Sequence, residues 1–232
     1  MNFLEGTVML VDKPYGWTSF DVVNKLRWHL KRALKVKKIK VGHAGTLDPL
    51  ATGLLIICTG KQTKKVNVFM AQDKTYTGTF LLGKTTPSFD LETHYNAAFP
   101  TDHITESALH EVSQSFLGEQ HQIAPLYSAK QVNGKRAYLL AREGKHMELK
   151  SHAITIMKFI IKANQFPEID FEISCSKGTY IRAIAQEFGA RLGSGATLIA
   201  LKRTQSGEFR VEEGKSVEDW IHIIKSMESP TL

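Results

Sequence analysis

The sequence has little cysteine: Cys58 and Cys175 are the two among 232 residues. Two are too few for a disulfide framework or a cysteine-rich metal site. No apolar run approaches the ~20 residues that a membrane-spanning helix needs, and the amino-terminal stretch lacks the basic and apolar regions of a secretory signal. The charge imbalance is modest, since 30 Lys and Arg oppose 23 Asp and Glu to give a net charge of +7. We therefore expect a cytoplasmic protein.

Several catalytic motifs are also missing. Gly60-Lys61 is followed by Gln62 and lacks the preceding glycine of a phosphate-binding loop. The histidines are scattered without the paired spacing of a metal motif, and no G-x-S-x-G sequence is present. These absences argue against a phosphate-binding loop, a metal site and Ser-His-Asp catalysis.

The hydrophobic pattern predicts an α+β fold. Apolar or alternating runs predict strands at 7–11, 76–82, 154–161 and 169–176. Helical spacing predicts helices that begin after Thr18 or Ser19, at 105, at 181 and after Ser216, with a short one at 136–142. Residues 42–53 are predicted as a long loop, and the run at 54–58 fits either a strand or a helix. Because no regular βαβ rhythm appears, a mixed sheet is favoured over a doubly wound fold.

Basic residues gather in three places. From Lys25 to Lys40 there are eight basic residues and no acidic one. The other two groups are Lys61, Lys64 and Lys65, and then Lys130, Lys135, Arg136, Arg142 and Lys145. The stretch after Gly207 is acidic instead. Such clusters suit a polyanionic partner, and an ordinary solvated surface explains them equally well.

One stretch concentrates glycines around a single carboxylate. From Gly42 to Gly53 the sequence reads GHAGTLDPLATG. Glycines let the backbone approach a ligand closely, and Pro49 biases Asp48 toward an extended conformation. Asp48 is therefore a candidate nucleophile or base, although an Asp in such a position more often forms a turn or a cap.

This stretch resembles the aspartate motif of the TruB family of tRNA pseudouridine synthases, with the pattern G-H-x-G-x-L-D-P-x-A-x-G-x-L. Every fixed position is present from Gly42 to Leu54. Other segments resemble further family motifs, in family order: Asp12-Lys13-Pro14 with Gly16, Thr18 and Ser19; Lys74-Thr75-Tyr76; Tyr127 to Lys130 and Asn133 to Gly144; Lys177 to Arg182; and Leu201 to Thr204 with Gly207 and Phe209. The resemblance covers residues 7 to about 210.

The resemblance implies a fold, an activity and a catalytic set. The fold would be that of pseudouridine synthases, a mixed and largely antiparallel sheet flanked by helices. The activity would be isomerisation of the T-loop uridine of tRNA, position 55, with no cofactor and no metal. Asp48 would be the catalytic aspartate, Tyr76 would stack on the target base, and Arg182 would pair with Asp48. Taken alone, Tyr76 fits a core aromatic and Arg182 a solvated helix residue.

The resemblance also implies how the RNA is held. His43 would fill the place of the base that is flipped out, and Tyr180 and Leu201 would wall the uracil pocket. The basic groups would grip the T-arm, and the residues expected to do so are Lys64, Lys130 and Arg142. We expect a monomer that binds the T-stem-loop without a protein partner or a membrane.

The domain organisation expected is one catalytic domain over residues 1–232, with an RNA-clasping insertion at about 120–150. Many family members continue into a carboxy-terminal RNA-binding PUA domain, and the 22 residues after Arg210 are too few for one. Two other departures from the family pattern are Pro87 where Asp is usual and Ala124 where many members have Pro.

Three alternatives stay open at this level. The chain could bind or fold tRNA without catalysis, using the same basic residues. It could be a guide-RNA-dependent synthase of the dyskerin type, although such proteins carry the PUA domain. An unrelated carboxylate glycosidase would need a second acid at a suitable distance, and no motif supplies one.

Overall fold

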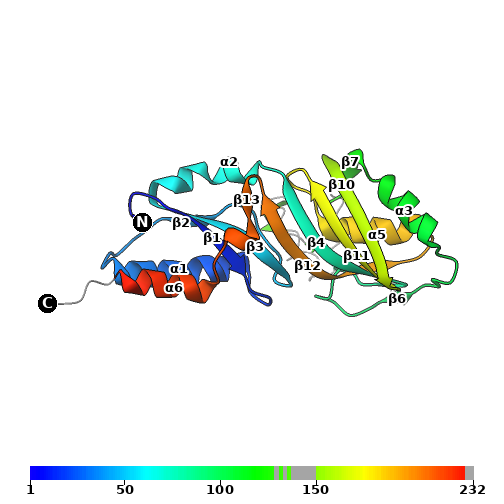
Figure 1. Ribbon diagram of the computed structural model, residues 1–232, viewed down its shortest axis with the longest axis horizontal. Coiled ribbons are helices and arrows are strands. Elements are labelled where there is room, and N and C mark those ends of the chain that lie inside the picture. The colour runs from blue at the N-terminus through cyan, green and yellow to red at the C-terminus, as the bar shows by residue number, and fades with distance from the viewer. Residues whose placement is uncertain (128–130, 133–134, 137–149, 228–232) are drawn as a thin grey trace. The chain divides into compact units, whose positions relative to one another are not determined.

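Nine of the described strands form a mixed sheet flanked by helices, as predicted (Figure 1). The computed structural model describes residues 1–127, 131–132, 135–136 and 150–227. These fall into two compact units: Met1–Tyr76 with Leu201–Leu232, and Thr77–Ala200. Strands β4 (Lys74–Leu82) and β12 (Ala196–Ser206) pass from one unit into the other. Within the described residues, no helix has the length and apolar character needed to cross a membrane.

The sheet of the first unit is built around β3 (Ala51–Thr59). Strand β1 (Val8–Lys13) pairs antiparallel with β3 along the whole of β1. Strand β2 (Val41–His43) pairs antiparallel with the carboxyl end of β3. Strand β12 pairs with β3 in parallel through Leu201–Arg203, which makes the sheet mixed. Strand β12 is bordered in turn by β4 and by the short β13 (Phe209–Arg210).

Helices cover both faces of these strands (Figure 1). Helix α1 (Ser19–Ala33) begins at a capping box between Thr18 and Asp21, and α6 (Val217–Ser226) begins at an equivalent box between Ser216 and Asp219. The two helices pack against each other. On the other face, α2 (Val66–Met70) follows the 3₁₀ helix η1 (Gly60–Lys65) and packs on a core cluster of Ala44, Leu54, Ile56, Cys58 and Val211.

The second unit packs two helices against a set of strands in the order β4, β11 (Glu168–Cys175), β10 (His152–Gln165) and β7 (Gly118–Gln122). Strand β10 pairs antiparallel with both of its neighbours. The helices are α3 (Glu106–Gln114) and α5 (Ile181–Arg191). Its core is a cluster of rings made by Phe80, Phe116, Phe159, Phe171 and Phe188.

Short elements complete the described part. Strands β5 (Lys84–Thr85) and β6 (Ala97–Ala98) form one hairpin, and β8 (Gln131–Val132) and β9 (Lys135–Arg136) form another. The 3₁₀ helix η2 (Val211–Glu213) follows β13. The helix predicted from residue 136 onward and most of the predicted insertion lie outside the described residues.

The predicted loop over residues 42–53 is too long. Strand β2 extends to His43 and β3 begins at Ala51, so the loop comprises residues 44–50. Its two ends join the sheet because Gly42 pairs with Cys58 and Ala51 pairs with Leu201, and Leu201 is remote from the loop in sequence. The ambiguous run at 54–58 is strand, and residues 196–206, for which no element is predicted, form β12.

Candidate active site

Asp48 lies in the loop between β2 and β3 of the first unit, and it is half-buried. The loop is tied to α1 because the Ser19 hydroxyl accepts from the backbone N–H of Leu47 (2.8 Å) and donates to its carbonyl (3.1 Å). A turn follows, in which the N–H of Ala51 donates to the carbonyl of Asp48 (3.1 Å). The carboxylate is therefore presented on a loop of fixed conformation.

A buried lysine lies beside this loop. Lys13 ends β1 and is 0% exposed, and its Nζ donates to the carbonyls of Pro14 (3.0 Å), Trp17 (2.5 Å) and Pro49 (3.3 Å). Burial lowers the pKa of Lys13 to about 8, while attraction to Asp48 works in the opposite direction. At neutral pH Lys13 is mostly protonated, and its charge favours the ionised form of the carboxylate.

A buried arginine holds the same loop from β12. Arg203 is 1% exposed, and its Nε donates to the carbonyl of Leu54 (2.7 Å) while a terminal nitrogen donates to that of Gly45 (3.1 Å). Gly53 has φ of +98°, and a Cβ there would lie 2.3 Å from the carbonyl oxygen of Arg203. Glycine is therefore required where β3 passes β12.

His43 occupies the end of β2, immediately before the loop. It is half-buried, and burial together with the nearby Arg203 charge lowers the pKa of its imidazole. Its Nδ1 is buried, and among the described residues it has no hydrogen bond of ordinary geometry. His43 is therefore neutral at physiological pH, which suits a side chain that contacts bases by stacking or hydrogen bonding.

Tyr76 and Leu201 belong to the same unit as Asp48. Tyr76 is a buried residue of β4 (9% exposed), and the strand is held to β12 by a hydrogen bond from the Thr204 hydroxyl to the Thr75 carbonyl (3.2 Å). Leu201 is partly exposed and lies opposite Ala51, three residues beyond Asp48, in the β12–β3 pairing. The first unit thus holds two of the three predicted catalytic residues and one predicted pocket wall.

Arg182 is placed in the second unit, where it is 3% exposed rather than solvated. Its Nε lies 3.5 Å from Oδ2 of Asp90, and its terminal nitrogens donate to the carbonyls of Ser88 (3.2 Å) and Tyr127 (2.9 Å). Helical periodicity was misleading here because these partners come from segments that pack over the amino-terminal turn of α5. The pairing of Arg182 with Asp48 stays a prediction.

Tyr180 is also in the second unit, where it is the amino-terminal cap residue of α5. Its backbone exchanges two hydrogen bonds with the Gln122 side chain, at 2.8 and 3.1 Å, and its ring meets His152 edge-on at 6.2 Å between centroids. These contacts fix the backbone of Tyr180 where α5 begins.

The predicted RNA-gripping residues are only partly described. Lys64 is exposed on η1, shortly after β3. Lys130 and Arg142 lie outside the described residues. Within the described residues, no three His, Cys, Asp or Glu side chains come together in a way that could hold a metal ion.

Sequence reasoning missed three charged residues of this architecture: Lys13, Arg203 and Asp90. Each lies in a segment that was compared with a family motif. No role was predicted for any of them, because a sequence motif does not show whether a side chain is buried. The available signal was that Lys13 and Arg203 directly follow or lie within segments rich in apolar and β-branched residues. For Asp90, no signal short of the fold pairs it with Arg182, which is 92 residues away.

The comparisons with known proteins agree with this architecture. The TruB family pseudouridylate synthase (N terminal domain) matches residues 31–181. A tRNA pseudouridine synthase B of Phocaeicola vulgatus is 54% identical over 95% of this chain and 94% of that protein. A tRNA pseudouridine synthase B of Flavobacterium johnsoniae is 52% identical over 91% of this chain and 93% of that protein.

Solved structures show the same fold at lower identity. In a crystal structure of a Cbf5-Nop10-Gar1 complex, one chain matches with a TM-score of 0.71 and 26% identity, covering 95% of this chain and 54% of that one. The present chain therefore spans about half the length of that structural neighbour. The curated relatives, by contrast, match this chain over nearly their full length. The guide-RNA-dependent alternative is therefore not favoured. Taken together, the motif around Asp48, the fold and these relatives establish that the chain belongs to the TruB family of pseudouridylate synthases.

Proposed function

We propose that this protein isomerises uridine to pseudouridine in tRNA, and that its target is the T-loop uridine at position 55. The observation that carries the proposal is the Asp48 carboxylate, set on a loop that Ser19, Lys13 and Arg203 hold in place. The family and the names of the near-full-length relatives support the same reaction. The position within tRNA rests on the motif resemblance.

The reaction needs no external reagent. The bond between N1 of uracil and C1′ of the ribose breaks, the base turns, and a bond forms between C5 and C1′. C5 loses its proton and N1 gains one, so atoms and charge balance. Asp48 acts in its ionised form on the sugar or the base, and the positive charge of Lys13 favours that form.

The other catalytic roles follow the family motifs. Tyr76 stacks on the target base and takes part in proton removal at C5, and Arg182 supplies a positive charge. Base stacking on an aromatic ring contributes ~1–3 kcal/mol, which offsets part of the cost of extruding the uridine from the RNA. His43, neutral and beside the loop, fills the vacated place in the RNA, while Tyr180 and Leu201 contact the uracil.

The substrate interface is proposed to lie on the T-stem-loop. Lys64, Lys130 and Arg142 contact its phosphates, which supply affinity and salt dependence rather than sequence specificity. The protein is proposed to act as a monomer in the cytoplasm, without a protein partner or a cofactor, and as one catalytic domain with an RNA-clasping insertion.

The proposal is tested with a T-stem-loop labelled with tritium at C5 of the target uridine. Wild-type protein releases tritium, and Asp48→Asn reduces the rate at least about a thousandfold, as is usual for loss of a catalytic group. Asp73→Asn, which removes an exposed carboxylate of the same unit, is the matched control and keeps the wild-type rate. Undiminished release by Asp48→Asn contradicts the mechanism. Binding without any release by wild-type protein favours the non-catalytic tRNA-binding alternative.

A further inference from the structure

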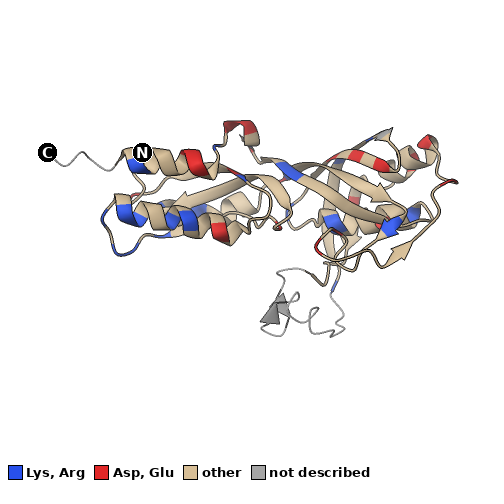
Figure 2. Cartoon of the chain, turned by 90° about the horizontal axis from the view of Figure 1, so that it is seen from below, with Lys and Arg blue, Asp and Glu red and all other residues tan. Residues whose placement is uncertain are grey.

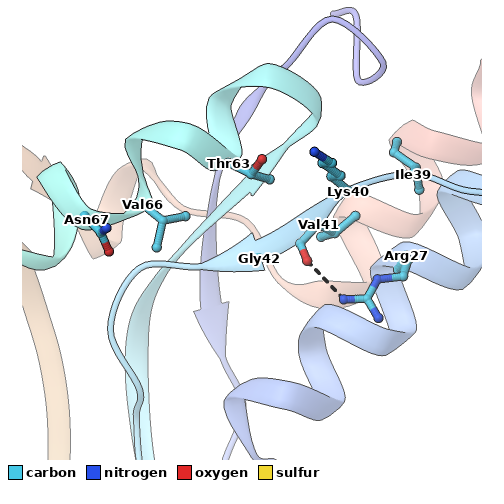
Figure 3. A pocket seen from close by; sticks show the side chains of 8 residues that line it. All are labelled: Arg27, Ile39, Lys40, Val41, Gly42, Thr63, Val66 and Asn67. Atoms are coloured by element: carbon cyan, nitrogen blue, oxygen red, sulfur yellow. Dashed lines mark hydrogen bonds between the residues drawn. The ribbon is translucent and has the colours of Figure 1, made fainter.

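The first unit contains a basic hollow that none of the proposed roles uses (Figure 3). It has a volume of about 450 Å³, and it is lined by Arg27, Ile39, Lys40, Val41, Gly42, Thr63, Val66 and Asn67. A second hollow of about 300 Å³ shares Ile39, Lys40 and Thr63 with it and adds Lys38, Lys61 and Lys64. The two therefore form one continuous track across the surface.

The track carries positive charge that acidic side chains of the described residues neutralise only at Lys61. No acidic residue lines either hollow. Arg27 donates to two neutral oxygens, the Val41 carbonyl (3.0 Å) and Asn24 Oδ1 (3.2 Å), and no acidic side chain among the described residues pairs with it. In the part of the chain that the structure describes, Lys61 pairs with Glu5, whereas Lys38, Lys40 and Lys64 have no ion pair. Figure 2 shows the contrast between the basic residues along α1 and the acidic ones on α6.

The hollow adjoins the start of the catalytic loop. Gly42 lies on its wall and is followed directly by His43, and the strand that carries both is fixed by pairing with Cys58 and Ile57. Adjacent Cα atoms are about 3.8 Å apart, so Gly42 on the wall of the hollow is one residue from His43. A phosphate bound in the hollow therefore lies within a few nucleotides, along the RNA, of a base that contacts His43. An RNA strand that contacts the protein loop at residues 44–50 can therefore also contact the hollow.

We propose that this hollow, between Arg27, Lys40 and Asn67, binds a phosphate of the RNA backbone in the T-arm, next to the strand segment that meets His43. The inference rests on the proposed function. Arg27 uses two of its five N–H donors within the protein, and the remaining ones suit phosphate oxygens. The Lys40 ammonium and the Asn67 amide add donors from two other sides (Figure 3). The apolar side chains of Ile39, Val41 and Val66 provide contact surface for a ribose.

The test measures binding of a fluorescent T-stem-loop by anisotropy between about 50 and 200 mM salt. Lys40→Glu is compared with Lys225→Glu, an equal charge change at an exposed position of α6. We expect Lys40→Glu to lower the slope of log K against log salt by about 1 or more. The affinity deficit relative to wild type is then roughly fourfold larger at the low salt end than at the high end. Lys225→Glu leaves the slope and the tritium release unchanged.

A second variant protects the test against a folding defect. Asn67→Asp keeps the side-chain size, lies on α2 rather than in the segment that carries Lys40, and places a negative charge in the hollow. It is expected to reproduce the effect of Lys40→Glu while the far-UV circular dichroism spectrum stays that of wild type. If both variants bind as Lys225→Glu does, the phosphate site is refuted.

Two further outcomes separate this inference from the proposed function. If wild-type protein forms no pseudouridine but its RNA binding depends on Lys40 and Asn67, the site stands and the proposed function falls. If tritium release is normal and RNA binding is unaffected by changes at either residue, the proposed function stands and the phosphate site is refuted. Titration with AMP distinguishes the sources of phosphate: AMP binding that depends on Lys40, together with RNA binding that does not, overturns the assignment to RNA.

Discussion

Removing the charge of Asp90 should destabilise the second unit strongly. The side chains of Arg182 and Asp90 are 4% and 6% exposed, and Nε and Oδ2 are 3.5 Å apart. At an effective dielectric constant of about 20, charges at that separation attract by about 5 kcal/mol. Asp90→Asn keeps the size of the side chain and can still accept from the N–H of Glu92, so the change mainly removes the Asp90 charge from beside the buried Arg182 guanidinium. Because Arg182 keeps two carbonyl acceptors, we expect a loss near the lower end of the range for broken buried pairs, about 3 kcal/mol.

The matched control is an exposed ion pair on α5, the helix that carries Arg182. Arg191 and Glu187 are 28% and 44% exposed, so Glu187→Gln should cost less than about 0.5 kcal/mol. Urea unfolding is followed by far-UV circular dichroism and by tryptophan fluorescence. All three tryptophans, Trp17, Trp28 and Trp220, lie in the first unit, so a loss confined to the second unit shifts the dichroism curve more than the fluorescence curve.

A double-mutant cycle decides whether charge pairing is the cause. Adding Arg182→Met to Asp90→Asn removes both members of the pair, so the double variant should be more stable than the sum of the single losses predicts. Equal stability of Asp90→Asn and Glu187→Gln refutes the argument, and so do strictly additive losses in the cycle.

Two further predictions concern the first unit. The pKa of Lys13 is about 8 in the folded protein against 10.5 unfolded, chiefly because of burial, so the unfolded state binds more protons between these values and stability rises with pH. Urea titrations should show wild type gaining about 1 kcal/mol between about pH 7.5 and 9, and Lys13→Met lacking that gain; a gain common to both proteins contradicts the assignment. Gly53→Ala should cost about 3 kcal/mol or more, since its Cβ would meet the Arg203 carbonyl at 2.3 Å with φ at +98°. Gly16→Ala has φ of +81° but nothing within 4 Å, so it should cost only about 1–2 kcal/mol, and similar melting temperatures for the two variants refute the steric reasoning.

Local patterns predicted helices α1, α3, α5 and α6 and strands β1, β4, β10 and β11. The cap of α1 depends on Thr18 and Asp21, three residues apart, and the alternation in β4 places Tyr76, Phe80 and Leu82 on one buried face. Such signals need only neighbours in sequence. The glycine-rich motif likewise identifies Asp48 and His43 as candidates from a single short stretch of sequence.

Strand β12 and the shortened loop were not predictable in this way. Strand β12 buries Thr197, Arg203 and Ser206 among its apolar residues, so its sequence shows no clean alternation. Strand β3 begins at Ala51 because Leu201 pairs with it from 150 residues away. Neither partner carries a local signal of the pairing.

The sequence by itself determined the family, the candidate carboxylate and the helices and strands with a clear hydrophobic period, because these depend on short motifs and on periodicity. Only the tertiary structure decided which charges are buried and what they hold. Arg182 meets Ser88 across 94 residues, and Arg203 meets Leu54 across 149. A charged side chain can be buried only where distant segments bring it acceptors or a counter-charge, and that arrangement exists only after the chain has folded.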